Sequence, residues 1–256
     1  MDPFTLPWVG LIIGTIAFGV LVHAWLCEKP RAYQRKVMTI LAVLLWLMST
    51  TFTFDRANDP RYYFPITQNF PLHFCSLVTF LLVPAFYLRD DSRWTKWYRA
   101  VLFYPGLAAP FLAVAAPAVE YLNQPLLSMN TLFYFVHLGN VVMVALMASL
   151  GFYRPTIKDI FKSLAGFTLL GVAIFPITLL LRHFVDPLAN YFFAFDPAGS
   201  AIFEALWNVI PIPFVYQLPL LVLVVPVLLL QYGIYYLMKK SHFGFHNHDT
   251  VQYVGR

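Results

Sequence analysis

Apolar stretches of membrane-spanning length, separated by short polar segments, run along the whole chain. An α-helix crosses the hydrocarbon core of a bilayer in about 20 residues, so stretches of that length are typical of transmembrane helices. The pattern predicts an all-α fold, a polytopic membrane helical bundle with seven transmembrane helices. The predicted spans are Pro7–Leu26, Val37–Phe54, Pro71–Leu88, Tyr98–Val119, Met129–Phe152, Ile160–Leu181 and Phe214–Met238.

The composition supports a membrane protein. Hydrophobic residues make up 60% of the 256-residue chain and charged residues only 11%, whereas a soluble domain carries about 25% charged residues. This deficit of charge excludes a disordered protein, a fibre and an ordinary cytosolic enzyme. We expect residues 1–240 to form a single transmembrane domain and residues 241–256 a cytoplasmic tail. Because Pro7–Leu26 lacks a basic segment before it and is long enough to span, we expect it to be a retained helix, not a cleaved signal peptide.

Lysine and arginine residues are concentrated in alternate predicted loops. The first, third and fifth loops and the segment after the last span are basic, whereas the intervening loops are poor in Lys and Arg. Because basic loops stay on the cytoplasmic side, this alternation predicts an N-terminus outside and a C-terminus in the cytoplasm. The net charge of +5 is thus assigned to topology, and no nucleic-acid partner is expected. The basic residues are Lys29, Arg31, Arg35 and Lys36, then Arg89, Arg93, Lys96 and Arg99, then Arg154, Lys158 and Lys162, then Lys239 and Lys240.

The sixth predicted loop, from Arg182 to Pro213, is long for a compact bundle. It contains an apolar piece, Ala201–Asn208, that is too short to span a membrane. We expect this piece to form either an interfacial helix or a re-entrant lid. The loop also carries Asn190, whose side-chain amide could orient a histidine or a lipid carbonyl.

The chain has two cysteines, Cys27 at the inner end of the first predicted span and Cys75 one turn inside the outer end of the third. On this topology they are about 20–30 Å apart, far beyond the roughly 7 Å between α-carbons that a disulfide allows. Both are therefore expected to be free thiols. The helix N-terminus after Pro71 favours a thiolate at Cys75, whereas apolar surroundings favour the neutral thiol. Cys75 is accordingly either a nucleophile activated by a nearby base or a small buried hydrophobic residue.

His137 is the candidate base, because an ionisable residue inside a membrane span is costly and indicates a function. At 1.5 Å per residue, it should lie about 12 Å from the outer end of its span and Cys75 about 6 Å. A Cys–His pair is therefore possible if the third and fifth spans are neighbours. The alternative is a structural histidine that hydrogen-bonds a neighbouring helix. His73 is expected either at the rim of the same cavity or at the polar interface. His73 and Asn140, which lies in the span of His137, are candidate substrate-binding or orienting residues, as is Asn190.

Several short motifs resemble those of a known membrane-protein family. They are Pro71-Leu72-His73-Phe74-Cys75, the region around His137, Tyr153-Arg154-Pro155-Thr156, and Ala189-Asn190-Tyr191 followed by Pro197-Ala198-Gly199. In this order, over roughly Phe70 to Leu230, they resemble the bacterial YwaF-like integral membrane family. That family is related to transmembrane protein 164 of animals, which is described as a lipid acyltransferase. More distantly, the chain resembles the androgen-induced membrane hydrolases, which use a threonine in place of the cysteine.

The resemblance implies a location in a bacterial cell membrane and a catalytic pair of Cys75 and His137. His73 and Asn190 also match positions of the family pattern, which does not establish their roles. We therefore predict acyl transfer on phospholipids through a thioester on Cys75, with Asn190 or helix-end amides at the oxyanion. With water as acceptor the same site would be an acyl-ester hydrolase.

The expected partners are a membrane phospholipid, an acyl acceptor and the surrounding membrane lipids. No sequence motif typical of a metal or nucleotide site is present, and no metal or cofactor is expected. The alternative function is that of a non-enzymatic lipid- or small-molecule-binding membrane protein or transporter subunit, which needs a cavity but no reactive thiol.

Overall fold

The computed structural model describes residues 5–58, 71–89, 92–115, 131–197 and 200–240. Within these ranges the chain is helical and contains no strand, which confirms the all-α prediction. The predicted tail, 241–256, lies outside the described residues. The long helices are α1 (Leu6–Leu26), α2 (Arg31–Asn58), α3 (Phe74–Ala85), α4 (Arg93–Ala115), α5 (Thr131–Ser149), α6 (Ile157–Phe184) and α9 (Val225–Lys240). Between α6 and α9 lie the short elements η3 (Tyr191–Phe193), α7 (Ala201–Val209), η4 (Val215–Gln217) and α8 (Leu220–Leu223).

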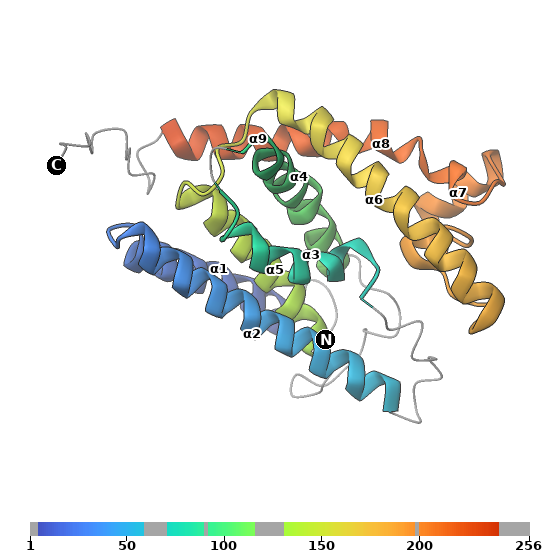
Figure 1. Cartoon of the computed structure of the whole chain (residues 1–256), viewed down its shortest axis with the longest axis horizontal. Helices are drawn as coiled ribbons and strands as arrows, with labels where there is room; N and C mark the ends of the chain where they lie inside the picture. Colours follow the sequence, from blue (N-terminus) through green and yellow to red (C-terminus); the bar gives the residue numbers. More distant parts are fainter. Residues whose placement is uncertain (1–4, 59–70, 90–91, 116–130, 198–199, 241–256) are drawn as a thin grey trace.

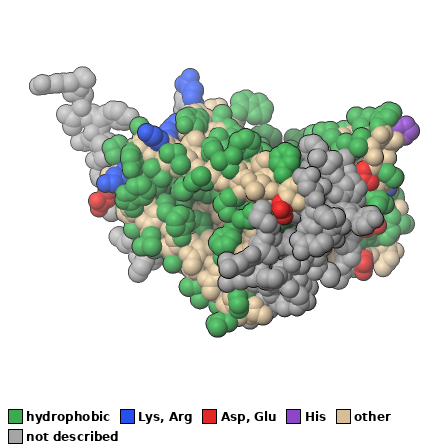
Figure 2. Space-filling model, turned by 90° about the horizontal axis from the view of Figure 1, so that it is seen from below, with side chains coloured by type: hydrophobic (Ala, Val, Ile, Leu, Met, Phe, Trp, Pro, Cys, Tyr) green, Lys and Arg blue, Asp and Glu red, His purple; other side chains and the backbone are tan. Residues whose placement is uncertain are grey.

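Six helical segments of the described chain are long and apolar enough to cross a membrane. Many of their large apolar side chains point outward, and hydrophobic side chains are spread over the face shown in Figure 2. Soluble monomers rarely expose apolar patches of this extent, so the chain is a multi-pass membrane protein. The six segments are Leu6–Leu26, Arg31–Asp55, Arg93–Ala115, Thr131–Ser149, Ile157–Phe184 and Val215–Lys240.

The third predicted span is shorter in the structure than in the prediction. The prediction covered Pro71–Leu88, but α3 has only 12 residues. That is about 18 Å at 1.5 Å per residue, against a hydrocarbon core of about 30 Å. The residues before Phe74 form a turn, and Pro84 lacks the N–H needed to continue the helical bonding. The apolar run is therefore longer than the helix within it, and α3 is not one of the six candidate spans.

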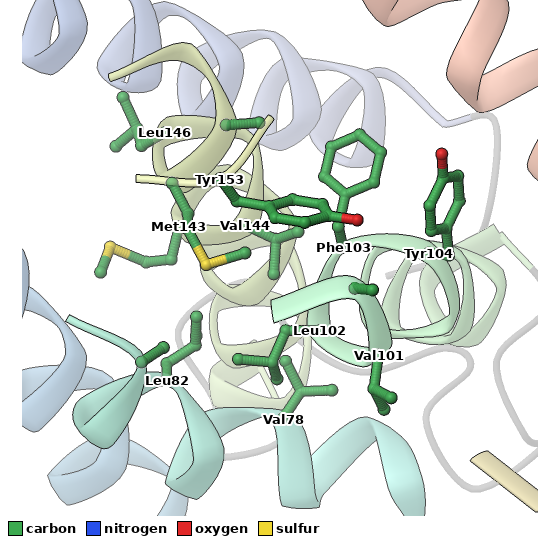
Figure 3. Close-up of a cluster of buried hydrophobic side chains, with 14 of the residues drawn as sticks. Val78, Leu82, Val101, Leu102, Phe103, Tyr104, Met143, Val144, Leu146 and Tyr153 are labelled. Carbon is green, nitrogen blue, oxygen red and sulfur yellow. The ribbon is translucent and has the colours of Figure 1, made fainter. Parts of the chain in front are cut away.

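The core of the bundle is built around α4 and α5. Helix α5 packs against α1, α2, α3 and α4, while α4 also contacts α6 and α9. Figure 1 shows α1 and α2 on one side of this pair and α6 and α9 on the other, with the short α3 beside α5. Gly139 allows α2 to approach α5 closely, because a β-carbon there would lie 2.4 Å from a methyl carbon of Leu45. Figure 3 shows side chains of α3, α4 and α5 meeting in this core, among them Val78, Leu82, Leu102, Met143 and Val144.

Two arginines join the turns at one end of the bundle. Arg31, in the first turn of α2, donates to the carbonyl of Leu150 at 2.9 Å. Arg99 donates to the carbonyl of Phe152 at 2.6 Å and to that of Ala85 at 2.9 Å. The prediction placed Arg99 among the loop charges, but it lies within α4 and is 2% exposed. Because carbonyls at helix C-termini lack internal partners, one buried guanidinium can pair several of them.

The start of α6 is capped by the Tyr153–Thr156 turn and by Asp159. The Asp159 carboxylate accepts hydrogen bonds from the Thr156 backbone N–H at 3.2 Å and hydroxyl at 2.8 Å, as in a capping box. Tyr153 donates its hydroxyl to the same carboxylate at 3.1 Å. Burial, together with the charge of Asp159, raises the pKa of Tyr153, so the phenol stays a neutral donor. The hydroxyl of Tyr153, a residue of the Tyr153–Thr156 motif, therefore serves to cap α6.

Candidate catalytic site

Cys75 lies in the first turn of α3. The carbonyl of His73, the residue before the helix, accepts the backbone N–H groups of Ser76 at 3.0 Å and Leu77 at 2.9 Å. Cys75 is half-buried, and both it and Cys27 are free thiols, as predicted. The earliest N–H groups of a helix have no internal acceptor. They are therefore suited to donate to negative charge that develops beside the sulfur.

His137 lies in the middle of α5 and is 5% exposed. Its Nδ1 lies 2.6 Å from the carbonyl oxygen of Phe133, and its ring packs on that of Phe133 with 4.1 Å between centroids. Because a carbonyl can only accept, Nδ1 carries the hydrogen, and in the neutral imidazole Nε2 is then the acceptor. Nε2 is buried and has no hydrogen-bond partner among the described residues. The structural alternative, a histidine bonded to a neighbouring helix, does not describe this arrangement, since Phe133 is one turn away on the same helix.

Asn140 joins α5 to α3. Its Nδ2 donates to the carbonyl of Cys75 at 3.2 Å and to the hydroxyl oxygen of Thr79 at 2.8 Å. The Thr79 hydroxyl in turn donates to Oδ1 of Asn140 at 3.1 Å. Both side chains are fully buried, at 0% exposure. The third and fifth predicted spans are therefore neighbours, which was the condition for a Cys–His pair.

The same contacts change the expected depths of Cys75 and His137. His137 precedes Asn140 by three residues, or about 4.5 Å along α5, which brings it toward the level of the first turn of α3. Cys75 lies ten residues before Ala85, about 15 Å from the C-terminal end of its helix. The prediction placed Cys75 nearer the outer surface than His137 by a helical turn, because it assumed that α3 continues to that surface. Because α3 begins only at Phe74, the assumption that it continues to that surface does not hold.

In this structure the thiol and the imidazole are not hydrogen-bonded to each other, since Nε2 of His137 has no partner in the described part of the chain. Side chains that react together are often loosely arranged before substrate binds. A change of rotamer, or a bridging substrate atom, is therefore required for proton transfer between them.

An aromatic segment covers the start of α3. The ring of His73 packs against those of Tyr191 and Phe193, with centroids 5.5 and 5.2 Å away. Phe74 contacts Phe192 at 6.3 Å. Phe192 and Phe193 have φ angles of 56° and 55°, in the left-handed region that bulky residues rarely adopt. We call η3, which these three loop residues form, the aromatic cover. It places His73 at the junction between α3 and the long loop.

Asn190 holds the loop that carries the aromatic cover. Its Oδ1 accepts the backbone N–H groups of Phe195 at 2.8 Å and Asp196 at 3.2 Å, and its Nδ2 donates to the Asp196 carbonyl at 2.8 Å. These bonds give Asn190 a role in closing the loop, and its amide is already engaged there. Further along, the apolar piece Ala201–Asn208, expected to be an interfacial helix or a re-entrant lid, lies within the helix α7 (Ala201–Val209).

Sequence reasoning did not identify Thr79 or the aromatic cover. Thr79 follows Cys75 by four residues, so a helical spacing could have indicated that the two share a face. The aromatic cover gave no such signal, because its approach to His73 depends on the path of the long loop. Among the described residues, His, Cys, Asp and Glu side chains do not form a group of three or more that could hold a metal ion.

Comparison with protein-family models matches residues 3–236 to the TMEM164 family. No curated protein and no solved structure matches the chain. The matched range includes both Cys75 and His137 and extends from α1 into α9.

Proposed function

The chain belongs to the TMEM164 family, and we propose that it is a lipid acyltransferase that uses Cys75 and His137. The main support is the buried Nε2 of His137, which has no partner in the described chain and lies on the helix that binds the backbone of Cys75. A buried polar atom without a partner is costly and calls for an explanation. A role as proton acceptor from the thiol explains it.

In the first half-reaction, Nε2 of His137 takes the proton of the Cys75 thiol. The sulfur then bonds to the ester carbonyl carbon of a phospholipid, and the carbonyl oxygen becomes an oxyanion. We assign its stabilisation to the backbone N–H groups of Phe74 and Cys75, at the start of α3. The carbon–oxygen ester bond breaks, the lyso-lipid oxygen takes the proton from His137, and the acyl chain remains on Cys75 as a thioester.

In the second half-reaction, the hydroxyl of an acceptor gives its proton to Nε2 of His137, and its oxygen attacks the thioester carbonyl. The carbon–sulfur bond breaks, and the thiolate recovers the proton from the imidazole. A lyso-lipid acceptor makes this reaction acyl transfer, whereas water makes it hydrolysis. No step requires a metal or a nucleotide.

A phospholipid is the substrate class that this position in the bundle favours. Cys75 belongs to a short helix within an apolar bundle, and the side chains that enclose His137 and the start of α3 are mostly aromatic or aliphatic. An acyl chain can reach such a site from the bilayer without leaving an apolar environment. A water-soluble substrate would lose its hydration there at considerable cost.

We also propose that α3 is a seventh membrane-inserted helix that crosses only part of the bilayer, with the N-terminus outside and the C-terminus in the cytoplasm. The arginine-linked turns lie at one end of the bundle. Most of the Lys and Arg side chains visible in Figure 2 lie toward one end of the molecule, the end at which α9 finishes at Lys240 in Figure 1. Basic groups at one end favour that end as the cytoplasmic one.

This orientation is testable with single cysteines in a chain whose two native cysteines are replaced by serine. Lys29→Cys lies in the exposed α1–α2 turn, and Leu188→Cys lies in the exposed loop after α6. A membrane-impermeant maleimide is expected to label Leu188→Cys in intact cells and Lys29→Cys only after the membrane is opened. The opposite labelling pattern would reverse the proposed orientation.

The catalytic proposal is tested by looking for the covalent intermediate. Purified protein in lipid nanodiscs is incubated with a phospholipid that carries an isotope-labelled acyl chain, and the adduct is mapped by mass spectrometry. We expect a hydroxylamine-sensitive acyl adduct on Cys75 that is absent from Cys75→Ala. Cys27→Ala is the matched control, since it removes the other free thiol and should retain the adduct.

An adduct that persists in Cys75→Ala would exclude Cys75 as the nucleophile. If the wild-type protein binds phospholipid but forms no adduct and transfers no acyl group, the non-enzymatic lipid-binding function replaces the proposed one.

A further inference from the structure

We propose that Asn140 and Thr79 are positioning residues that hold the backbone of Cys75 in line with His137. This inference rests on the proposed function and deepens it. It concerns two side chains that need not touch the substrate and that form a polar pair inside an otherwise apolar helix contact.

The geometry of the pair is specific. One hydrogen of the Asn140 amide goes to the Thr79 hydroxyl oxygen at 2.8 Å and the other to the Cys75 carbonyl at 3.2 Å. The Thr79 hydroxyl donates to Oδ1 of Asn140 at 3.1 Å. Every donor of the two side chains is thereby used. Since both residues are fully buried, water does not compete for these bonds.

The position of Asn140 on α5 gives the pair its significance. His137 is on the same helix, three residues earlier, so the base and the group that holds the nucleophile share one rigid element. Helix α3 is short and begins at Phe74, and the first turn of a helix has the fewest internal hydrogen bonds. Asn140 gives the turn that carries Cys75 a directional bond to α5, beside the apolar contacts between the two helices. These contacts lack the directionality of a hydrogen bond.

A purely structural role would predict a loss of stability and nothing more. A positioning role predicts a loss of the chemical step, because a displacement of about 1 Å between reacting groups can cost about 100-fold in rate. The double variant Asn140→Leu/Thr79→Val distinguishes the structural role from the positioning role. It replaces both partners by apolar groups of similar shape. Such a replacement can be nearly neutral for stability.

For the double variant in nanodiscs, we expect the kcat of acyl transfer to fall about tenfold to a hundredfold, with KM for the phospholipid unchanged. Thr79→Ser retains the hydroxyl and should keep a nearly normal kcat, whereas Thr79→Val should lower it. Gln34→Leu is the matched control. It removes another buried amide-to-carbonyl bond between two helices, from Gln34 to Leu26 at 3.0 Å, and it should leave kcat unchanged.

A second readout does not depend on acyl transfer. The rate of alkylation of Cys75 by N-ethylmaleimide is measured against pH in the wild type, in His137→Ala and in the double variant. We expect the wild-type profile to differ from that of His137→Ala, and the double variant to match His137→Ala. If the wild type and His137→Ala already share one profile, the Cys–His pairing is wrong and this inference falls with it. If they differ but the double variant keeps the wild-type profile and kcat, the positioning role is overturned and the proposed function stands.

Discussion

Replacing His137 by alanine is expected to lower the rate of Cys75 acylation by about 10²–10⁴-fold, the usual contribution of a general acid–base group. The expectation follows from the state of the imidazole. Its Nδ1 is committed to the Phe133 carbonyl at 2.6 Å, and its buried Nε2 is without a partner in the described chain. Alanine removes the only group assigned to take the thiol proton. His137→Gln should be equally slow, since a carboxamide retains polarity but is not a base.

The measurement is the single-turnover rate of acyl transfer from a labelled phospholipid to Cys75, with the folded fraction determined by size-exclusion chromatography. His23→Ala is a suitable control, because His23 is a second histidine within a predicted span and, unlike His137, hydrogen-bonds to a neighbouring helix. Its Nδ1 lies 3.0 Å from the Ser149 hydroxyl, and Ser149 is twelve residues after His137 on α5, about 18 Å along the helix. We expect this control to acylate at the wild-type rate. Acylation of His137→Ala at the wild-type rate would remove His137 from the mechanism.

The sequence was sufficient to predict the helices but not the length of α3. Long apolar runs have one stable structure in a bilayer, because every backbone polar group must be paired internally. Hydrophobicity alone does not show where a helix within such a run begins and ends. In the run from Pro71 to Leu88, the turn before Phe74 and the proline at position 84 shorten the helix. The shortening therefore removes the basis for the predicted depth of Cys75, the proposed nucleophile.

The candidate site could be predicted in part. Cys75 and His137 stood out because their residue types are rare inside a span, and their helices are now seen to be neighbours. The Asn140–Thr79 pair could not be predicted, because it joins residues 61 positions apart in sequence and depends on the relative rotation of two helices. Asn190 was expected to orient a histidine or a lipid carbonyl, whereas its bonds to Phe195 and Asp196 lie within the loop itself.

The structure of the loop after α6 was beyond sequence analysis for a different reason. Two successive phenylalanines in the left-handed region each cost of order 1–3 kcal/mol, so local preference argues against their conformation. The two residues keep this conformation because tertiary contacts hold them in it. Tyr216 and Gln217 both donate to the Phe193 carbonyl, and the ring of Phe192 packs against that of Phe167 at 5.6 Å.

Replacing Arg99 by leucine is expected to produce a large loss of stability. Its guanidinium donates to the carbonyls of Ala85 at 2.9 Å, Phe152 at 2.6 Å and Leu88 at 3.2 Å. Hydrogen bonds to charged groups contribute about 1.5–3 kcal/mol each, and an unpaired buried acceptor costs about 1–3 kcal/mol. Even with partial access of water to Leu88, the free energy of unfolding should fall by about 3 kcal/mol or more.

For a chain of this size, such a loss corresponds to a decrease in Tm of roughly 6–12 °C, measured by thermal unfolding in detergent. Arg99→Lys should be intermediate, because an ammonium keeps the charge but lacks the planar fork that reaches three carbonyls at once. Lys96→Gln is the matched control, since Lys96 lies one turn earlier on α4 and is exposed. Its Tm should change little. A Tm for Arg99→Leu equal to that of this control would contradict the prediction.

The reason for so large an effect is the brevity of α3. Helix α3 has only 12 residues, so hydrogen bonds at its two ends add to the apolar packing of Val78 and Leu82 between them. Asn140 binds the end that carries Cys75, and Arg99 binds the carbonyls of the other end to α4 and to the α5–α6 turn. Loss of the Arg99 bonds should therefore lower the temperature at which α3 leaves the bundle, while kcat well below that temperature stays close to that of the wild type. The Asn140→Leu/Thr79→Val double variant should do the reverse, lowering kcat with little change in Tm.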